Sequence, residues 1–111
     1  MTSETITIVT EHFANELKDI FGKELKKVIL YGSCARGDFS PDSDIDVMIL
    51  LEIHPEELPL ARKKVMEASD KLDLDYDVVL TPVVQTARIF DQYRKASVFY
   101  QNIEKEGVLV A

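Results

Sequence analysis

The stretch from Val28 to Glu52, VILYGSCARGDFSPDSDIDVMILLE, constrains the fold of this chain more than any other segment. Val28–Tyr31 is a short, β-branched apolar run that Gly32 interrupts, and Ile45–Leu51 is a second apolar run. The letters DFSPDS before the second run favour a turn. The pattern predicts two strands joined through a loop, with polar residues gathered where the strands and the loop meet.

Two acidic residues open the second predicted strand. Asp44 and Asp46 are two positions apart, so on a strand their carboxylates project from the same face, about 6–7 Å apart. Carboxylates at this spacing repel each other unless a cation lies between them. Mg²⁺ is the expected ion, because it takes oxygen ligands and usually completes its shell with substrate phosphates.

The Gly32-Ser33 pair predicts the other half of such a site. Glycine lets a ligand approach the backbone closely, and the amide groups that open a short helix over Ser33–Arg36 would point at an anion. Together with the acidic pair, this turn predicts a site for a metal-bound polyphosphate. Arg36 adds a positive charge, for which a phosphate contact and a surface ion pair both stay open.

In these residues the chain resembles the minimal nucleotidyltransferases of the DNA polymerase β superfamily. That family's pattern is Gly-Ser, ten residues and then Asp-x-Asp, which here is Gly32-Ser33, Cys34–Ser43 and Asp44-Ile45-Asp46. The letters ARGDFSPDSDIDVMIL and FYQNIEKEGVLV are also similar to the family's. The resemblance therefore covers nearly the whole chain.

The resemblance implies an α/β nucleotidyltransferase fold, in which helices pack against a short mixed sheet of at least three strands. The alternation of helical and strand patterns favours the same class independently. Apolar spacing predicts three main helices and a charged connector with solvated lysines. The helices cover Thr5–Phe21 with a stop at Gly22, Leu58–Leu72 after Pro55, and Arg88–Glu106; the connector is Lys23–Lys27.

The segment Leu74–Thr81 predicts the third strand, which Pro82 would end. Asp73, Asp75 and Asp77 share one parity in this segment and therefore one face. By resemblance, Asp77 best matches the third carboxylate of the family, and Asp75 is the alternative.

The resemblance also implies a reaction, in which an acceptor oxygen attacks the α-phosphorus of a nucleoside triphosphate and pyrophosphate leaves. The family implies ATP as the triphosphate. Two Mg²⁺ ions would stabilise charge on both sides of the displacement. Asp44 and Asp46 would hold both ions, and Asp77 would hold the ion nearer the acceptor. Gly32 and Ser33 would bind the β- and γ-phosphates, with Arg36 as a further candidate for nucleotide binding.

Size and charge restrict the acceptor. With 111 residues the chain is expected to form a single domain over residues 1–111. The net charge of −7 argues against an extensive nucleic-acid surface, since Lys and Arg hold phosphate backbones. No apolar run approaches the ~20 residues that cross a bilayer, and no signal-peptide pattern opens the chain. With one cysteine and no internal disulfide, a cytoplasmic location is the expectation.

Minimal nucleotidyltransferases are often the antitoxin of a pair with a HEPN-domain ribonuclease, and such antitoxins transfer AMP onto a tyrosine of the toxin. The leading hypothesis is therefore a Mg²⁺-dependent protein adenylyltransferase that acts as an antitoxin on a HEPN-domain partner. Two alternatives stay open. One is a binding module that masks its partner without catalysis, and the other is a small-molecule nucleotidyltransferase completed by a helical second subunit.

The other reactive side chains favour structural roles. Cys34 has no base near it in sequence and is interpreted as a small inert residue. His12 and His54 are too scattered for a metal site, and Tyr31 is assigned to the core in preference to base stacking. The aromatic residues of the last predicted helix exceed what one core stripe needs, which leaves room for a partner surface.

Overall fold

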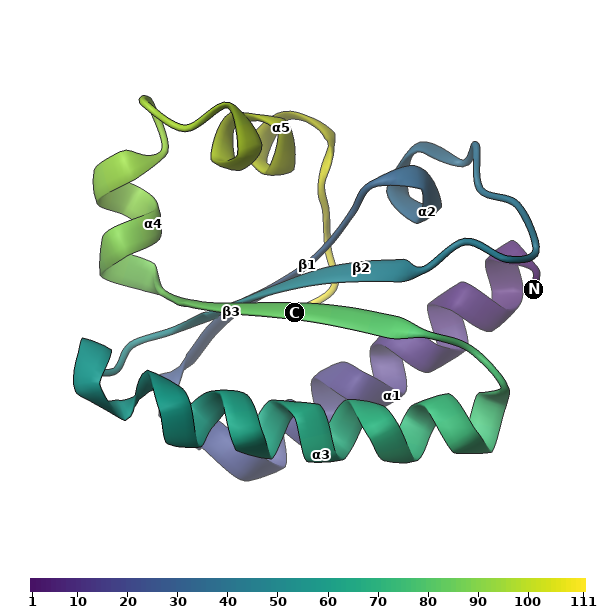
Figure 1. Ribbon diagram of the computed structural model, residues 1–111, viewed down its shortest axis with the longest axis horizontal. Coiled ribbons are helices and arrows are strands. Elements are labelled where there is room, and N and C mark those ends of the chain that lie inside the picture. The colour runs from purple at the N-terminus through teal and green to yellow at the C-terminus, as the bar shows by residue number, and fades with distance from the viewer.

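A four-stranded mixed sheet in the order β3-β2-β1-β4 forms the centre of the computed structural model, which describes residues 1–111 (Figure 1). Strand β2 pairs with β1 antiparallel and with β3 parallel, while β4 pairs with β1 antiparallel. The predicted α/β class and mixed sheet are thereby confirmed. The strands are β1 (Leu25–Tyr31), β2 (Ile45–Leu51), β3 (Leu80–Thr86) and β4 (Val108–Leu109).

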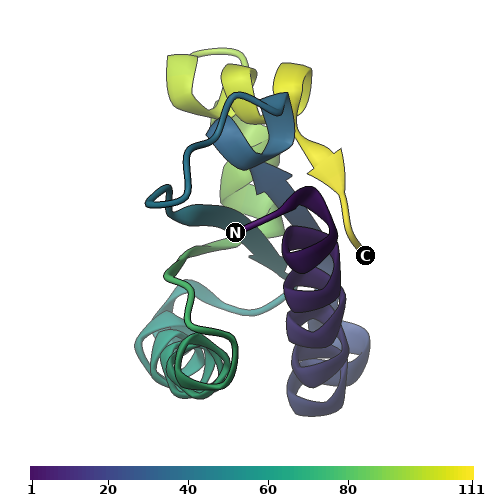
Figure 2. The same cartoon turned by 90° about the vertical axis from the view of Figure 1, so that its right-hand side faces the viewer.

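Helices cover both faces of this sheet (Figures 1 and 2). The long helices α1 and α3 lie side by side on one face, α4 and α5 lie on the other, and the short α2 lies beyond the end of β1 with Cys34 in the α1/α3 cluster. None of the helices is long and apolar enough to cross a membrane. The helices are α1 (Ser3–Phe21), α2 (Ser33–Arg36), α3 (Leu58–Tyr76), α4 (Ala87–Tyr93) and α5 (Val98–Glu106), with short 3₁₀ turns at Gly22–Glu24 and Pro55–Glu57.

The period of two along the strands divides the core into two clusters. On the α1/α3 face, Val47 and Ile49 of β2 pack in the larger cluster. On the other face, Met48 and Leu50 pack with Phe90 of α4 and Ile103 of α5. Asp46 has the parity of Met48, so its side chain faces the side of the sheet that α4 and α5 cover only in part.

The first helix forms where its apolar spacing predicts. The Thr2 hydroxyl caps its start by accepting a hydrogen bond from the Thr5 amide (3.1 Å), so it begins two residues before the predicted start. Gly22, with a φ of 55°, ends it as predicted. Val9, Phe13 and Leu17 are fully buried against the sheet, which anchors the helix.

The predicted third strand at Leu74–Thr81 is wrong. Leu74–Tyr76 is the last turn of α3, and the chain reverses at Asp77, whose φ is 54°. The Asp73 carboxylate accepts a hydrogen bond from the Leu80 amide (2.8 Å) and so fixes the start of β3. The strand then continues through Pro82, because β3 is an edge strand and the missing N–H is tolerated there.

The predicted last helix is divided into α4 and α5. The Ser97 hydroxyl accepts a hydrogen bond from the Tyr100 amide (3.2 Å), which starts a new helix after a break at residues 94–97. The unpredicted strand β4 follows and pairs two of its residues with β1. The predicted connector is also wrong in part, because β1 begins at Leu25 and includes the exposed Lys26 and Lys27.

Candidate functional site

The Gly-Ser turn lies where β1 ends. Gly32 has φ 73° and ψ −156°, a conformation that side chains disfavour, and it leads directly into α2. The amides of Ala35 and Arg36 both donate to the Gly32 carbonyl at 3.1 Å, which closes this short helix. The first amides of a helix lack partners inside it, so this turn can present N–H groups to an anion.

The acidic pair lies at the start of the neighbouring strand. Asp46 is the second residue of β2 and the cross-strand partner of Tyr31, and Asp44 comes just before the strand. A Cβ atom at Gly32 would overlap the Asp46 Oδ2 atom. The structure therefore brings the glycine turn and the second carboxylate of the pair into direct contact.

Thr81 on β3 completes the surroundings of Asp46. It is the parallel-register partner of Asp46, and its hydroxyl donates to Asp46 Oδ1 at 2.5 Å. Sequence reasoning did not select this residue, because its importance follows from the register of β3 and that strand was misplaced. The only indication of it in the sequence is that Thr81 is a polar residue between apolar neighbours.

Tyr31 and Cys34 lie close enough to Asp46 to feel its charge. Burial raises the pKa of the Tyr31 phenol to about 12, and the Asp46 carboxylate adds to that effect. Burial and, to a smaller extent, Asp46 also raise the pKa of the Cys34 thiol. Both side chains are therefore held in their neutral forms, which agrees with the inert role predicted for Cys34.

The predicted third carboxylate is not gathered with the other two. Asp77 is exposed at the end of α3, four residues before Thr81, and it lines a small pocket with Asp42 and Ser43. Asp75 is exposed on α3. No group of three or more His, Cys, Asp or Glu side chains is arranged to hold a metal ion. The assignment of Asp77 stays a prediction.

Among Asp73, Asp75 and Asp77, Asp73 is the carboxyl group whose pKa the Asp44 charge affects. Burial raises its pKa, the hydrogen bond from the Leu80 amide opposes that shift, and the charges of Asp70 and Asp44 raise it further. Because this carboxylate accepts from the Leu80 backbone, its role in the structure is to fix the start of β3.

Arg36 forms ion pairs in this structure. Its Nε lies 3.2 Å from the Asp38 carboxylate and its Nη1 lies 3.3 Å from the Glu106 carboxylate. These hydrogen bonds raise the pKa of the Arg36 guanidinium. Of the two options left open by the sequence, the structure displays the surface ion pair.

The donor set suits a hard divalent cation. Asp44 is exposed and Asp46 is half-buried, so both offer carboxylate oxygens beside a turn suited to phosphate. Mg²⁺ is commonly held by one or two carboxylates together with substrate phosphates and water. The Asp46 carboxylate beside Gly32, together with Asp44 two residues earlier, therefore fits such an ion.

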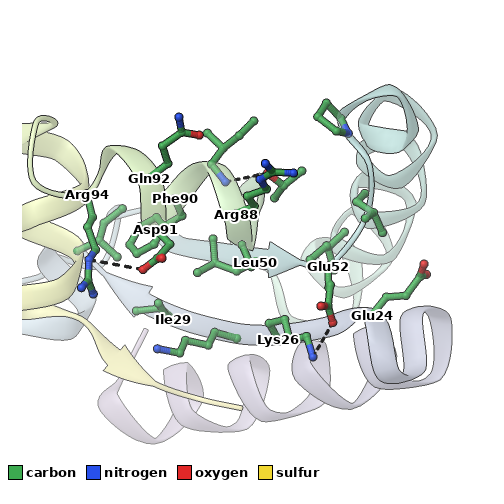
Figure 3. A pocket seen from close by; sticks show the side chains of 18 of the residues that line it. Glu24, Lys26, Ile29, Leu50, Glu52, Arg88, Phe90, Asp91, Gln92 and Arg94 are labelled. Atoms are coloured by element: carbon green, nitrogen blue, oxygen red, sulfur yellow. Dashed lines mark hydrogen bonds and ion pairs between the residues drawn. The ribbon is translucent and has the colours of Figure 1, made fainter.

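A wide groove lies elsewhere on the molecule. It has a volume of about 1320 Å³ and is lined by the start of β1, the end of β2 and α4 (Figure 3). Apolar side chains such as Leu50 and Phe90 form its wall, and the ion pairs Lys26–Glu52 (2.7 Å) and Asp91–Arg94 (3.6 Å) lie along it. Neither the Gly-Ser turn nor the acidic pair lines this groove, so the candidate site is at the other end of β1 and β2.

The chain as a whole is similar to known proteins. The family model described as "Nucleotidyltransferase domain" matches residues 11–110. Two proteins of Methanocaldococcus jannaschii, each named "Putative protein adenylyltransferase", are 34% identical to this chain. One alignment covers 87% of this chain and 89% of the relative, and the other covers 96% and 99%.

Solved structures share the fold. One, the crystal structure of a toxin–antitoxin with AMP-PNP, has a TM-score of 0.59 and 24% identity over 91% of this chain and 72% of the other. A second, of the tri-AMPylated Shewanella oneidensis HEPN toxin with its MNT antitoxin, matches with a TM-score of 0.53 and 21% identity. That match covers 95% of this chain and 71% of the other.

Proposed function

This chain belongs to the nucleotidyltransferase domain family, and from that premise we propose that it transfers AMP from ATP to a hydroxyl group of a protein partner. One observation carries the proposal, namely the contact between Gly32 and the Asp46 carboxylate. It unites a turn suited to phosphate with a carboxylate suited to Mg²⁺, as a metal-bound triphosphate requires.

The residues take distinct roles in this proposal. Gly32 and Ser33 bind the β- and γ-phosphates, and Asp44 and Asp46 hold two Mg²⁺ ions. When bound, these ions supply the positive charge that an in-line displacement needs at the attacking and leaving oxygens. Asp77 is proposed as the third carboxylate on the strength of the family resemblance, which requires the turn at residues 77–79 to move towards the pair.

The acceptor is proposed to be a tyrosine of a HEPN-type toxin, with this chain as the antitoxin. The names of the M. jannaschii relatives support a protein acceptor, and the modified HEPN toxin in one similar structure supports its type. The net charge of −7 adds support, since it disfavours a nucleic-acid acceptor.

The test is incubation of the chain with its toxin, ATP and Mg²⁺, followed by mass spectrometry of the toxin. A gain of one or more AMP groups on a toxin tyrosine is expected. The Asp44→Asn/Asp46→Asn double variant should abolish both the modification and the neutralisation of the toxin. Glu11→Gln/Asp19→Asn, which removes the same charge from two exposed positions of α1, is the matched control and should retain both.

The same variants separate catalysis from masking. Neutralisation that survives in Asp44→Asn/Asp46→Asn, with the toxin unmodified, would show that binding alone inactivates the toxin. An unmodified toxin in the presence of the unaltered chain, with AMP found on an added small molecule instead, would replace the protein acceptor by a small one.

A further inference from the structure

We infer that Thr81 is a positioning residue that aims the Asp46 carboxylate at the Gly-Ser turn, an inference that rests on the proposed function. Thr81 touches neither the phosphate turn nor Asp44 in the proposed reaction. It acts through Asp46, to which it is bound across the β2–β3 pair.

The two oxygens of Asp46 have different neighbours. Oδ1 accepts the hydroxyl of Thr81 from β3, and Oδ2 lies over Gly32 at the end of β1. Because β2 lies between β1 and β3, the carboxylate bridges both neighbouring strands. Fixing Oδ1 on the β3 side therefore sets the direction of Oδ2, the oxygen beside the phosphate turn.

A threonine hydroxyl suits this task for three reasons. It stabilises a carboxylate as a neutral donor, so it leaves the negative charge that attracts a metal ion. Its β-branched side chain has few rotamers, which keeps the donor in place. Its other contact, with the Ile45 carbonyl at 3.4 Å, is at the long end of the hydrogen-bond range, and a carboxylate accepts more strongly than a carbonyl, so Asp46 is the better acceptor.

The expected effect of losing this bond is weaker metal binding. Partners that hydrogen-bond a metal ligand typically contribute about 10- to 100-fold to metal affinity. Thr81→Val keeps the shape of the side chain and removes the donor, whereas Thr81→Ser keeps the donor. Affinity for the metal should therefore fall by about 10- to 100-fold in Thr81→Val and return to near the original value in Thr81→Ser.

The measurement is a titration of the chain with Mn²⁺ in the presence of α,β-methylene ATP, an analogue whose α–β linkage is not cleaved. Electron paramagnetic resonance reports free Mn²⁺ without turnover, and the same titration of the analogue without the chain is subtracted to give the Mn²⁺ that the chain binds. Thr7→Val is the matched control, because Thr7 is an exposed helical threonine whose hydroxyl donates to the Ser3 carbonyl (3.1 Å). If Thr81→Val folds poorly, Thr81→Ala and Thr81→Ser make the same comparison.

Each outcome decides the inference. A fall in affinity in Thr81→Val and Thr81→Ala, with rescue in Thr81→Ser, supports it. Unchanged affinity in folded Thr81→Val, with affinity lost in Asp46→Asn, would overturn the role of Thr81 and leave the proposed function standing. Binding of Mn²⁺ that is insensitive to Asp46→Asn would overturn both.

Discussion

The Arg36 guanidinium lies 3.3 Å from the Glu106 carboxylate, and this ion pair joins α2, which follows the phosphate turn, to α5 near the end of the chain. A nucleotide phosphate and Glu106 would therefore compete for the same side chain. Both partners are partly exposed, so the competition is weak.

We expect Glu106→Gln to lower the KM for MgATP by less than about tenfold, because it releases Arg36 from an exposed ion pair. Arg36→Gln should raise that KM. Steady-state kinetics check both effects, with Glu52→Gln as the control because it breaks the Lys26–Glu52 pair at the far end of β2. An unchanged KM in Arg36→Gln would remove Arg36 from the nucleotide site.

Gly32→Ala should abolish nucleotide binding. The new Cβ would overlap Asp46 Oδ2, and backbone strain at this conformation costs about 1–3 kcal/mol. Gly37→Ala is the matched control, because Gly37 also has a positive φ, 86°, but has open space around the added atom. Calorimetric titration with MgATP should show binding in Gly37→Ala and none in Gly32→Ala.

Tyr31 should make stability fall at high pH. Its pKa is about 12 in the folded chain and 10.0 in the reference state, so the folded state keeps a proton that the unfolded state releases. The stabilisation is complete below pH 10.0 and is lost as the pH rises towards 12. Denaturant unfolding should therefore show the wild type losing stability relative to Tyr31→Phe over this range.

The Asp46→Asn variant tests the origin of that shift. Burial is the larger cause and the Asp46 charge the smaller, so the tyrosinate absorbance attributed to Tyr31 should move to lower pH and stay above its reference value. A return all the way to the reference pKa would mean that charge, and not burial, dominates.

Asp77→Asn should lower kcat and metal affinity if the turn after α3 closes on the acidic pair, as the proposed mechanism requires. Asparagine tolerates the left-handed backbone at this position, so stability should change little. Glu67→Gln is the control, being an exposed carboxylate elsewhere on α3 to which no site role is assigned. Equal effects of the two substitutions on kcat would exclude Asp77 from the metal site.

Local patterns were sufficient where one physical cause acts alone. The run Ile45–Leu51 is apolar, bounded by turn residues and centrally placed, and the strand has those bounds. Gly32 is required by a backbone conformation that other residues avoid, so the position of the turn was also predictable.

Sequence patterns gave a wrong prediction where a contact with another segment of the chain determines the secondary structure. The alternating letters LDLDYD indicate a strand, yet Leu72 is buried against the core and Asp73 bonds to the Leu80 amide, which extends the helix to Tyr76. Pro82 normally ends a strand and is tolerated here only because β3 lies at the edge of the sheet. The contact of Thr81 with Asp46 depends on that register and could not be predicted from spacing.

Tyr31, Asp46 and Thr81 lie at one level of three adjacent strands, so the backbone ladder of the sheet, and not a mobile loop, sets their separation. Separating Tyr31 from Asp46 requires removal of β2 from β1, and the next residues of β2, Val47, Met48 and Ile49, are completely buried. The backbone amide protons of β2 beside Asp46 should therefore be among the last in the chain to exchange with solvent. A molecule with frayed termini would still keep the pairing of Tyr31 with Asp46, which is lost only when β1 and β2 separate.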